Sequence, residues 1–117
     1  MRKCLIVDDS LENLQLLRTL LSVENRFAIA EANSGQSAFE LLLSSDFDVV
    51  ISDYEMNDGD GLWLLGKIKE IKNRPHMIIF SGQIHLREED LLNAGADAFF
   101  PKPFSLRNLI DYVQNLK

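Results

Sequence analysis

The stretch FDVVISD, residues 47–53, gives the first indication of the fold. Its centre, Val49–Ile51, is continuously apolar and made only of β-branched residues, which is typical of a strand covered on both faces in a parallel sheet. The run then changes abruptly to Ser52 and Asp53. A buried strand that ends in a carboxylate points to a binding site, because open α/β sheets hold their ligands at the carboxyl ends of the strands.

Three further apolar runs also lead into polar side chains. Since the carboxyl ends of parallel strands lie along one edge of a sheet, we expect these polar groups to surround one crevice. The runs and the residues that follow them are Lys3–Val7 with Asp8 and Asp9, Met77–Phe80 with Ser81, and Ala98–Phe100 with Lys102 between two prolines.

Helical patterns separate the strand-like runs. Ser10–Ser22 has leucines at a helical period, and Ser10 is a suitable N-cap. With a further strand at Phe27–Glu31, five strands alternate with five helices, which predicts an α/β fold with a doubly wound five-stranded parallel sheet and right-handed crossovers. We expect a single domain over residues 1–117. The other predicted helices are Ser34–Leu43, Asp58–Ile71, Leu86–Asn93 and Ser105–Leu116.

Composition narrows the functional classes. The net charge of −6 argues against direct binding to nucleic acid or to anionic membranes. No apolar stretch approaches the roughly 20 residues that cross a bilayer. The single cysteine, Cys4, cannot form an internal disulfide and is expected to be a buried, unreactive thiol in a reducing cytoplasm.

The polar residues at the strand ends suit phosphoryl chemistry. Carboxylate clusters bind hard divalent cations such as Mg²⁺, and a hydroxyl and an ammonium group suit phosphoryl oxygens. A carboxylate can itself attack phosphorus to form an acyl phosphate, and Asp53 is the candidate nucleophile. His76 and His85 lack metal-ligand spacing and are expected to be surface residues.

Several short motifs occur along the chain in a fixed order. They are Val7-Asp8-Asp9, Ser52-Asp53, Met56, Asp60-Gly61, Ser81-Gly82, Ala94-Gly95-Ala96-Asp97 and Lys102-Pro103-Phe104. In this order and spacing they resemble the receiver domain of bacterial two-component response regulators, and the resemblance spans the whole chain. It implies the flavodoxin-like strand order 2-1-3-4-5, with Asp53 as the phosphoacceptor. The phosphoryl donor would be a phosphohistidine on a histidine kinase or a histidine phosphotransfer protein.

The resemblance also assigns roles around Asp53. Mg²⁺ would be held by Asp9 and Asp53, by Asp8 partly through a bound water, and by the main-chain carbonyl of Glu55. Lys102 would contact the phosphoryl oxygens as the counter-ion of Asp53, and its flanking prolines stiffen the backbone there.

Four more positions concern the switch and the lifetime of the phosphoryl group. Ser81 would donate its hydroxyl to a phosphoryl oxygen, and Phe99 is either an aromatic switch that follows Ser81 or a fixed core residue. Glu55 and Gln83 would flank the approach of a hydrolytic water and so tune dephosphorylation. We expect the downstream protein partner or output domain to lie outside these 117 residues.

The chain also departs from the family pattern. Met56-Asn57 stands where methionine-proline is usual, which makes this loop more flexible, and the interval from Ser81 to Lys102 is about one residue short. The shortened region belongs to the family's output face, so the resemblance does not identify the downstream partner.

Two other functions are compatible with this sheet but fit less well. An aspartyl phosphohydrolase of the related class needs a second aspartate two residues after the nucleophile, where this chain has Glu55. An FMN-binding flavodoxin needs a phosphate loop rich in hydroxyls and glycine after its first strand. Here that position is Asp8-Asp9, which would repel a phosphate unless a metal intervened.

Overall fold

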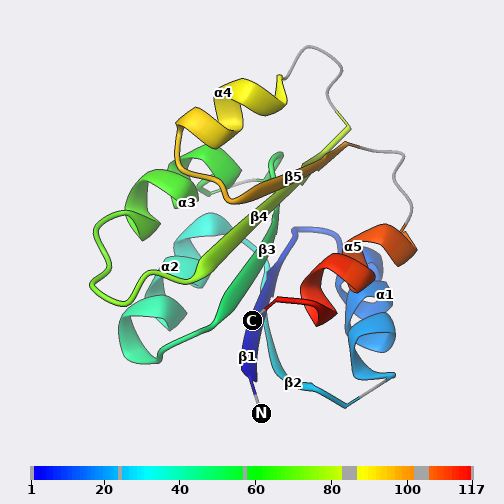
Figure 1. Ribbon diagram of the computed structural model, residues 1–117. Coiled ribbons are helices and arrows are strands. Elements are labelled where there is room, and N and C mark those ends of the chain that lie inside the picture. Colours follow the sequence, from blue (N-terminus) through cyan, green and yellow to red (C-terminus); the bar gives the residue numbers. More distant parts are fainter. Residues whose placement is uncertain (1, 24, 57, 83–86, 102–105, 117) are drawn as a thin grey trace.

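The computed structural model describes residues 2–23, 25–56, 58–82, 87–101 and 106–116 as five parallel strands with helices on both faces (Figure 1). The strand order is β2-β1-β3-β4-β5, which confirms the predicted doubly wound α/β fold. The strands are β1 Arg2–Val7, β2 Phe27–Ala32, β3 Val49–Asp53, β4 His76–Ser81 and β5 Ala98–Pro101. The helices are α1 Leu11–Ser22, α2 Gly35–Ser44, α3 Gly61–Ile68, α4 Glu88–Asn93 and α5 Leu106–Gln114.

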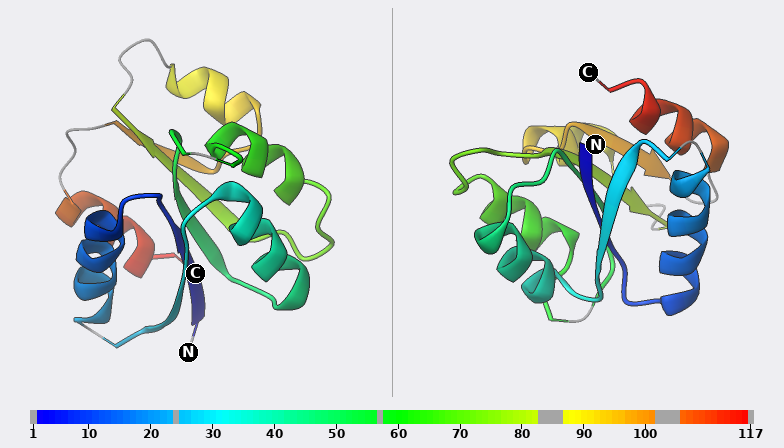
Figure 2. Two further views of the ribbon diagram at one scale, coloured as in Figure 1. Left: turned by 180° about the vertical axis from the view of Figure 1, so that it is seen from behind. Right: turned by 90° about the horizontal axis from the view of Figure 1, so that it is seen from below.

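Two hydrophobic layers flank the sheet. Helices α1 and α5 cover one face, and α2, α3 and α4 cover the other (Figure 2). Strand β1 contributes to both, because alternate side chains point to opposite faces. Cys4 and Ile6 pack with α1 and α5, whereas Leu5 and Val7 pack with the opposite helices.

Strand β3 lies at the centre of the sheet, and all its residues are buried. In the parallel register, Val7 of β1 pairs with Ser52, and Asp53 pairs with Phe80 of β4. The residue that follows Val7 is therefore at the level of Asp53, and the residue that follows Phe80 lies one position beyond it. This register places the ends of β1, β3 and β4 together at one edge.

Side chains cap the amino ends of α1, α2 and α3. The hydroxyl of Ser10 accepts a hydrogen bond from the Asn13 amide at 3.3 Å, which confirms the predicted N-cap of α1. Ser34 caps α2 by accepting from the Ser37 amide at 3.0 Å. These bonds satisfy N–H groups that have no partner within the first helical turn.

Helix α3 is shorter than predicted at both ends, because it begins at Gly61 rather than Asp58 and ends at Ile68 rather than Ile71. Asp58 and Gly59 have φ values of 52° and 95°, which lie in the left-handed region and cannot continue a right-handed helix. Asp60 instead caps α3 by accepting from the Trp63 amide at 2.9 Å. The residues after β3 therefore form a loop with a defined backbone conformation.

At the other end of the molecule, Gly95 follows α4 with a φ of 116°. A left-handed residue directly after a helix is a common way for the helix to end, and glycine adopts this conformation without a Cβ clash. The predicted start of this helix, Leu86, lies outside the described residues. Among the helices described, none combines the length and apolar character required to cross a bilayer.

Candidate functional site

Three carboxylates meet at the carboxyl edge of the sheet. Asp8 and Asp9 follow β1, and Asp53 is the last residue of β3. One oxygen from each lies within 4.8 Å of the others. Asp8 and Asp53 are buried with exposed fractions of 0% and 5%, and Asp9 is exposed. Oxygen donors at this separation suit a hard divalent cation that keeps part of its water shell, as Mg²⁺ does.

Helix α1 fixes the orientation of Asp8. One carboxylate oxygen accepts from the Ser10 amide at 2.8 Å, and the other accepts from the Asn13 side-chain amide at 3.1 Å. Each oxygen can accept more than one hydrogen bond or ligand. Asp8 is therefore held by the start of α1 while it retains capacity for a metal or a metal-bound water.

The main chain around Asp53 is held with similar precision. The Tyr54 amide donates to the carbonyl of Phe80 at 2.8 Å, which extends the pairing of β3 and β4 beyond Asp53. The Glu55 amide donates to Oδ1 of Asp53 at 3.3 Å. These contacts turn the chain sharply after the strand and bring Glu55 beside the carboxylate.

Ser81 and Glu55 are brought together across two strands. Ser81, at the end of β4, is only 1% exposed, and its hydroxyl donates to Oε1 of Glu55 at 3.4 Å. The sequence predicted both residues near Asp53, but it did not predict this contact between them. Residues 26 positions apart give no local sequence signal of such a pair.

The other predicted site residues stand as follows. Lys102 and Gln83 lie outside the described residues, so their roles stay predictions. Phe99 on β5 is half-buried, packs against the core on the side of α2, α3 and α4, and pairs in register with Ile79. This packing is compatible with either a switch or a fixed core residue, so the choice between them stays open.

The β3–α3 loop, residues 54–60, closes on itself beside the site. The Gly61 amide donates to the carbonyl of Tyr54 at 2.8 Å. A Cβ on Gly61 would lie 2.8 Å from both the Asp53 carbonyl oxygen and the Tyr54 Cα, closer than real Cβ contacts. The glycine of the Asp60-Gly61 motif therefore has a steric cause, because it lets α3 begin directly against β3, the strand that ends in Asp53.

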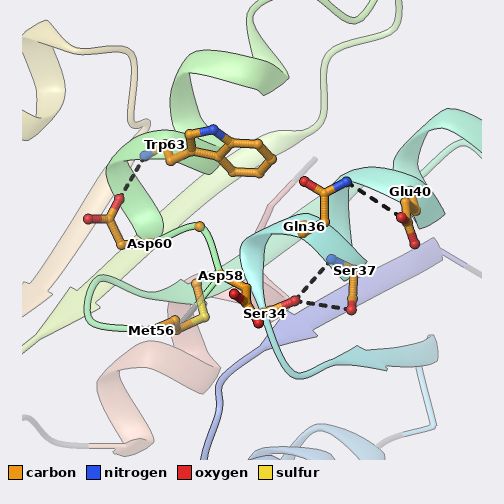
Figure 3. A pocket seen from close by; sticks show the side chains of 9 residues that line it. Ser34, Gln36, Ser37, Glu40, Met56, Asp58, Asp60 and Trp63 are labelled. Atoms are coloured by element: carbon orange, nitrogen blue, oxygen red, sulfur yellow. Dashed lines mark hydrogen bonds between the residues drawn. The ribbon is translucent and has the colours of Figure 1, made fainter.

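A hollow of about 660 Å³ lies between this loop and the start of α2 (Figure 3). The half-buried Trp63 lies along it and packs edge-on against Phe39, with ring centroids 6.1 Å apart. The carboxylate cluster is not part of this lining. The described residues around the hollow are Ser34, Gln36, Ser37, Glu40, Met56, Asp58, Gly59, Asp60 and Trp63.

A further polar contact lies at the opposite end of β4. His76 Nε2 and the Tyr112 hydroxyl are 2.7 Å apart and join β4 to α5. Burial, and secondarily the carboxylate of Asp97, raise the pKa of Tyr112 above its ordinary value. The prediction that His76 is a simple surface residue is therefore wrong, because the residue is half-buried and paired.

The sequence profile of the response regulator receiver domain matches residues 4–114. The chain belongs to this family. The receiver domain is 37% identical to the CpxR homologue of Haemophilus influenzae, a transcriptional regulatory protein, over 97% of this chain and 49% of that protein. It is 31% identical to the transcriptional regulatory protein SrrA of Staphylococcus aureus, over 96% of this chain and 46% of that one. The chain thus spans about half the length of these regulators.

Solved structures agree with this family. The receiver domain superposes on that of Francisella response regulator 1452 with a TM-score of 0.88, at 28% identity, covering 97% of this chain and 94% of that chain. The response regulator TrrA of Thermotoga maritima, solved in complex with Mg²⁺-BeF, gives a TM-score of 0.86 at 32% identity, with full coverage of both chains. The predicted family and fold are therefore confirmed.

Proposed function

We propose that this receiver domain accepts a phosphoryl group on Asp53 in a magnesium-dependent reaction. The donor is a phosphohistidine on a histidine kinase or a histidine phosphotransfer protein. The principal support is the cluster of Asp8, Asp9 and Asp53, whose oxygens lie within 4.8 Å of one another at the edge of the sheet. Relatedness to TrrA, which was solved with Mg²⁺-BeF, supports the same metal.

The reaction forms a bond between a carboxylate oxygen of Asp53 and phosphorus, while the bond from phosphorus to the donor imidazole nitrogen breaks. The imidazole leaves as a neutral ring when the other ring nitrogen of the phosphohistidine already carries a proton. Asp9, Asp53, the Glu55 carbonyl and, through water, Asp8 would hold Mg²⁺, which supplies positive charge to the equatorial phosphoryl oxygens. Lys102 would pair with the same oxygens.

Ser81 responds to the new anion. Its single O–H now donates to Glu55, and it would donate to a phosphoryl oxygen once Asp53 is modified. That movement, followed by Phe99, would shift the equilibrium between two conformations of the surface formed by β4, α4, β5 and α5. The domain is thus proposed to be a cytoplasmic signalling switch, with residues 1–117 as its receiver unit.

The partner is a second part of the proposal. The regulators that the chain matches are about twice as long as the matched region, so output is expected from a linked domain or from a separate protein bound to this face. The negative net charge of −6 makes this domain itself unsuited to direct contact with nucleic acid.

Intact-mass measurement after incubation with acetyl phosphate and Mg²⁺ tests the phosphoacceptor. We expect one added phosphoryl group on the wild-type domain and none on Asp53→Asn, because the amide keeps the shape but is not a nucleophile. Asp46→Asn is the matched control, since Asp46 is an exposed aspartate before β3, and it should label like the wild type. Equal labelling of the Asp53→Asn protein would overturn the assignment.

A further inference from the structure

The start of α2 is bonded to the β3–α3 loop. The Gly35 amide donates to the Gly59 carbonyl at 2.9 Å, and the Gln36 amide donates to the Asp58 carbonyl at 3.0 Å. Amides in the first turn of a helix have no partner within the helix, so the loop supplies acceptors that α2 lacks. Figure 3 shows Asp58 beside Ser34 at this junction.

The contact depends on an unusual backbone on both sides. Asp58 and Gly59 are the two successive loop residues in the left-handed region, and it is their carbonyls that accept. A Cβ on Gly35 would lie 2.3 Å from the Gly59 oxygen and 2.8 Å from its carbonyl carbon. Because these are backbone atoms, no side-chain rotation could relieve the overlap. The loop can approach α2 this closely only when position 35 is glycine.

The other end of the same loop is tied to the phosphoacceptor. The Glu55 amide contacts Oδ1 of Asp53, and the Glu55 carboxylate accepts from Ser81. The loop is closed at its base by the bond from Gly61 to Tyr54. The described residues on both sides of position 57 are thus bonded to fixed elements, so a displacement at Gly59 would alter the segment that contains Glu55.

We propose that Gly35 is a positioning residue for the site at Asp53. Through the carbonyls of Gly59 and Asp58, the start of α2 fixes the β3–α3 loop. It thereby sets where Glu55 presents its carbonyl to the metal and its carboxylate to Ser81. This inference rests on the proposed function, because the effect is read as metal binding and phosphoryl transfer.

Gly35→Ala is the direct test, with Gly66→Ala as its matched control. A Cβ at Gly66, on the exposed side of α3, would meet no atom of the described structure within 4 Å. By calorimetry with Mg²⁺ alone, we expect Gly35→Ala to raise the dissociation constant about three- to ten-fold, the ratio that corresponds to one net hydrogen bond. The initial rate of labelling by acetyl phosphate should fall in parallel. Gly66→Ala should leave both quantities unchanged.

A second pair of variants addresses the same contact by different chemistry and decides the matter if Gly35→Ala does not fold. Gln36→Pro removes the N–H that donates to Asp58, at a first-turn position that tolerates proline. Gln36→Ala keeps that N–H and removes only an exposed side chain. We expect the proline variant to bind Mg²⁺ more weakly and the alanine variant to bind it normally.

Separate readouts distinguish positioning from plain stability. Trp63 is the single tryptophan, and a Cβ on Gly59 would lie 2.7 Å from its ring, so its fluorescence reports the junction directly. If Gly35→Ala or Gln36→Pro lowers Tm but leaves Mg²⁺ affinity and labelling at wild-type values, the positioning role is wrong. Failure of the proposed function looks different, since the wild-type domain itself would then neither bind Mg²⁺ nor become labelled.

Discussion

Removing one carboxylate from the cluster should change stability in opposite directions with and without magnesium. At 4.8 Å, two unit charges repel by about 0.9 kcal/mol in water and about 3.5 kcal/mol at an effective dielectric constant of 20. Asp9 is exposed, so solvent screening makes the lower value appropriate. Its two repulsions, with Asp8 and Asp53, then total about 2 kcal/mol.

Asp9→Asn also loses a favourable interaction with the amino end of α1, about 0.5 kcal/mol for an exposed charge. The variant should therefore be more stable than the wild type by about 1 kcal/mol in EDTA. For a chain of 117 residues, that corresponds to a Tm increase of about 3–5 °C. Glu12→Gln is the control, because Glu12 lies in the first turn of α1 but outside the cluster. It should show only the helix-dipole loss and become slightly less stable.

Magnesium should make the wild type more stable than Asp9→Asn, which is the reverse of the order expected in EDTA. At a concentration 100 times the dissociation constant, the wild-type domain gains about 2.7 kcal/mol. A variant that binds about 100 times more weakly gains only about 0.4 kcal/mol, so the wild type becomes the more stable protein by about 1 kcal/mol. Thermal unfolding followed by circular dichroism, in EDTA and in Mg²⁺, measures both differences. If Asp9→Asn is less stable in EDTA, or gains as much as the wild type from Mg²⁺, the electrostatic reasoning is refuted.

Three other perturbations give sharp outcomes. Tyr112→Phe should cost about 1 kcal/mol at neutral pH through the lost hydrogen bond to His76. The pKa of Tyr112 is raised from 10.0 in the folded state. The protonated phenol therefore contributes to the free energy of unfolding below pH 10, and this contribution is lost as pH rises through the native pKa. Urea unfolding of the wild type at pH 8 and above pH 10 should show that loss, and an equal loss in Tyr112→Phe would contradict it. Burial raises the pKa of Cys4 to about 12. Iodoacetamide at pH 8 should therefore modify the native thiol far more slowly than the thiol of the unfolded chain, as followed by mass spectrometry. Equal rates would count against burial of Cys4. Glu55→Asn should speed phosphate release from Asp53 more than Glu55→Gln does, with Mg²⁺ constant, and an unchanged or slower release would show that Glu55 does not shield the phosphoryl group.

The sheet and its edge were predictable because the determinants are local and repetitive. The central strands are short, largely apolar runs, and parallel pairing brings all strand ends to one edge. Once Val49–Ile51 is assigned as a buried strand, Asp53 must lie at that edge, and the same reasoning places Asp8 and Asp9 beside it. The carboxylate cluster therefore follows from strand assignments that need no knowledge of side-chain contacts.

The loop after β3 could not be predicted in this way. Leu62, Leu65 and Ile68 continue a helical period back toward Asp58, so the pattern favours an earlier start for α3. Left-handed Asp58 and Gly59 instead accept hydrogen bonds from the Gln36 and Gly35 amides at the start of α2, which lie 22 and 24 positions earlier in the chain. A main-chain contact of this kind leaves no trace in hydrophobic periodicity. The pair of His76 and Tyr112, 36 residues apart, escaped prediction for the same reason.

Glu55 is the residue at which these separate constraints meet. Its main-chain position is set by the β3–α3 loop. Gly35 lets this loop pack against the start of α2, and Gly61 lets the start of α3 pack against the main chain of Asp53. The Glu55 carboxylate accepts the Ser81 hydroxyl at 3.4 Å, longer than an ordinary O–H···O bond and therefore weak. Since Ser81 has one proton to donate, a phosphoryl oxygen and Glu55 would compete for it. The position of the loop thus influences how readily Ser81 turns to the phosphoryl group, which links the start of α2 to the switch without any direct contact between them.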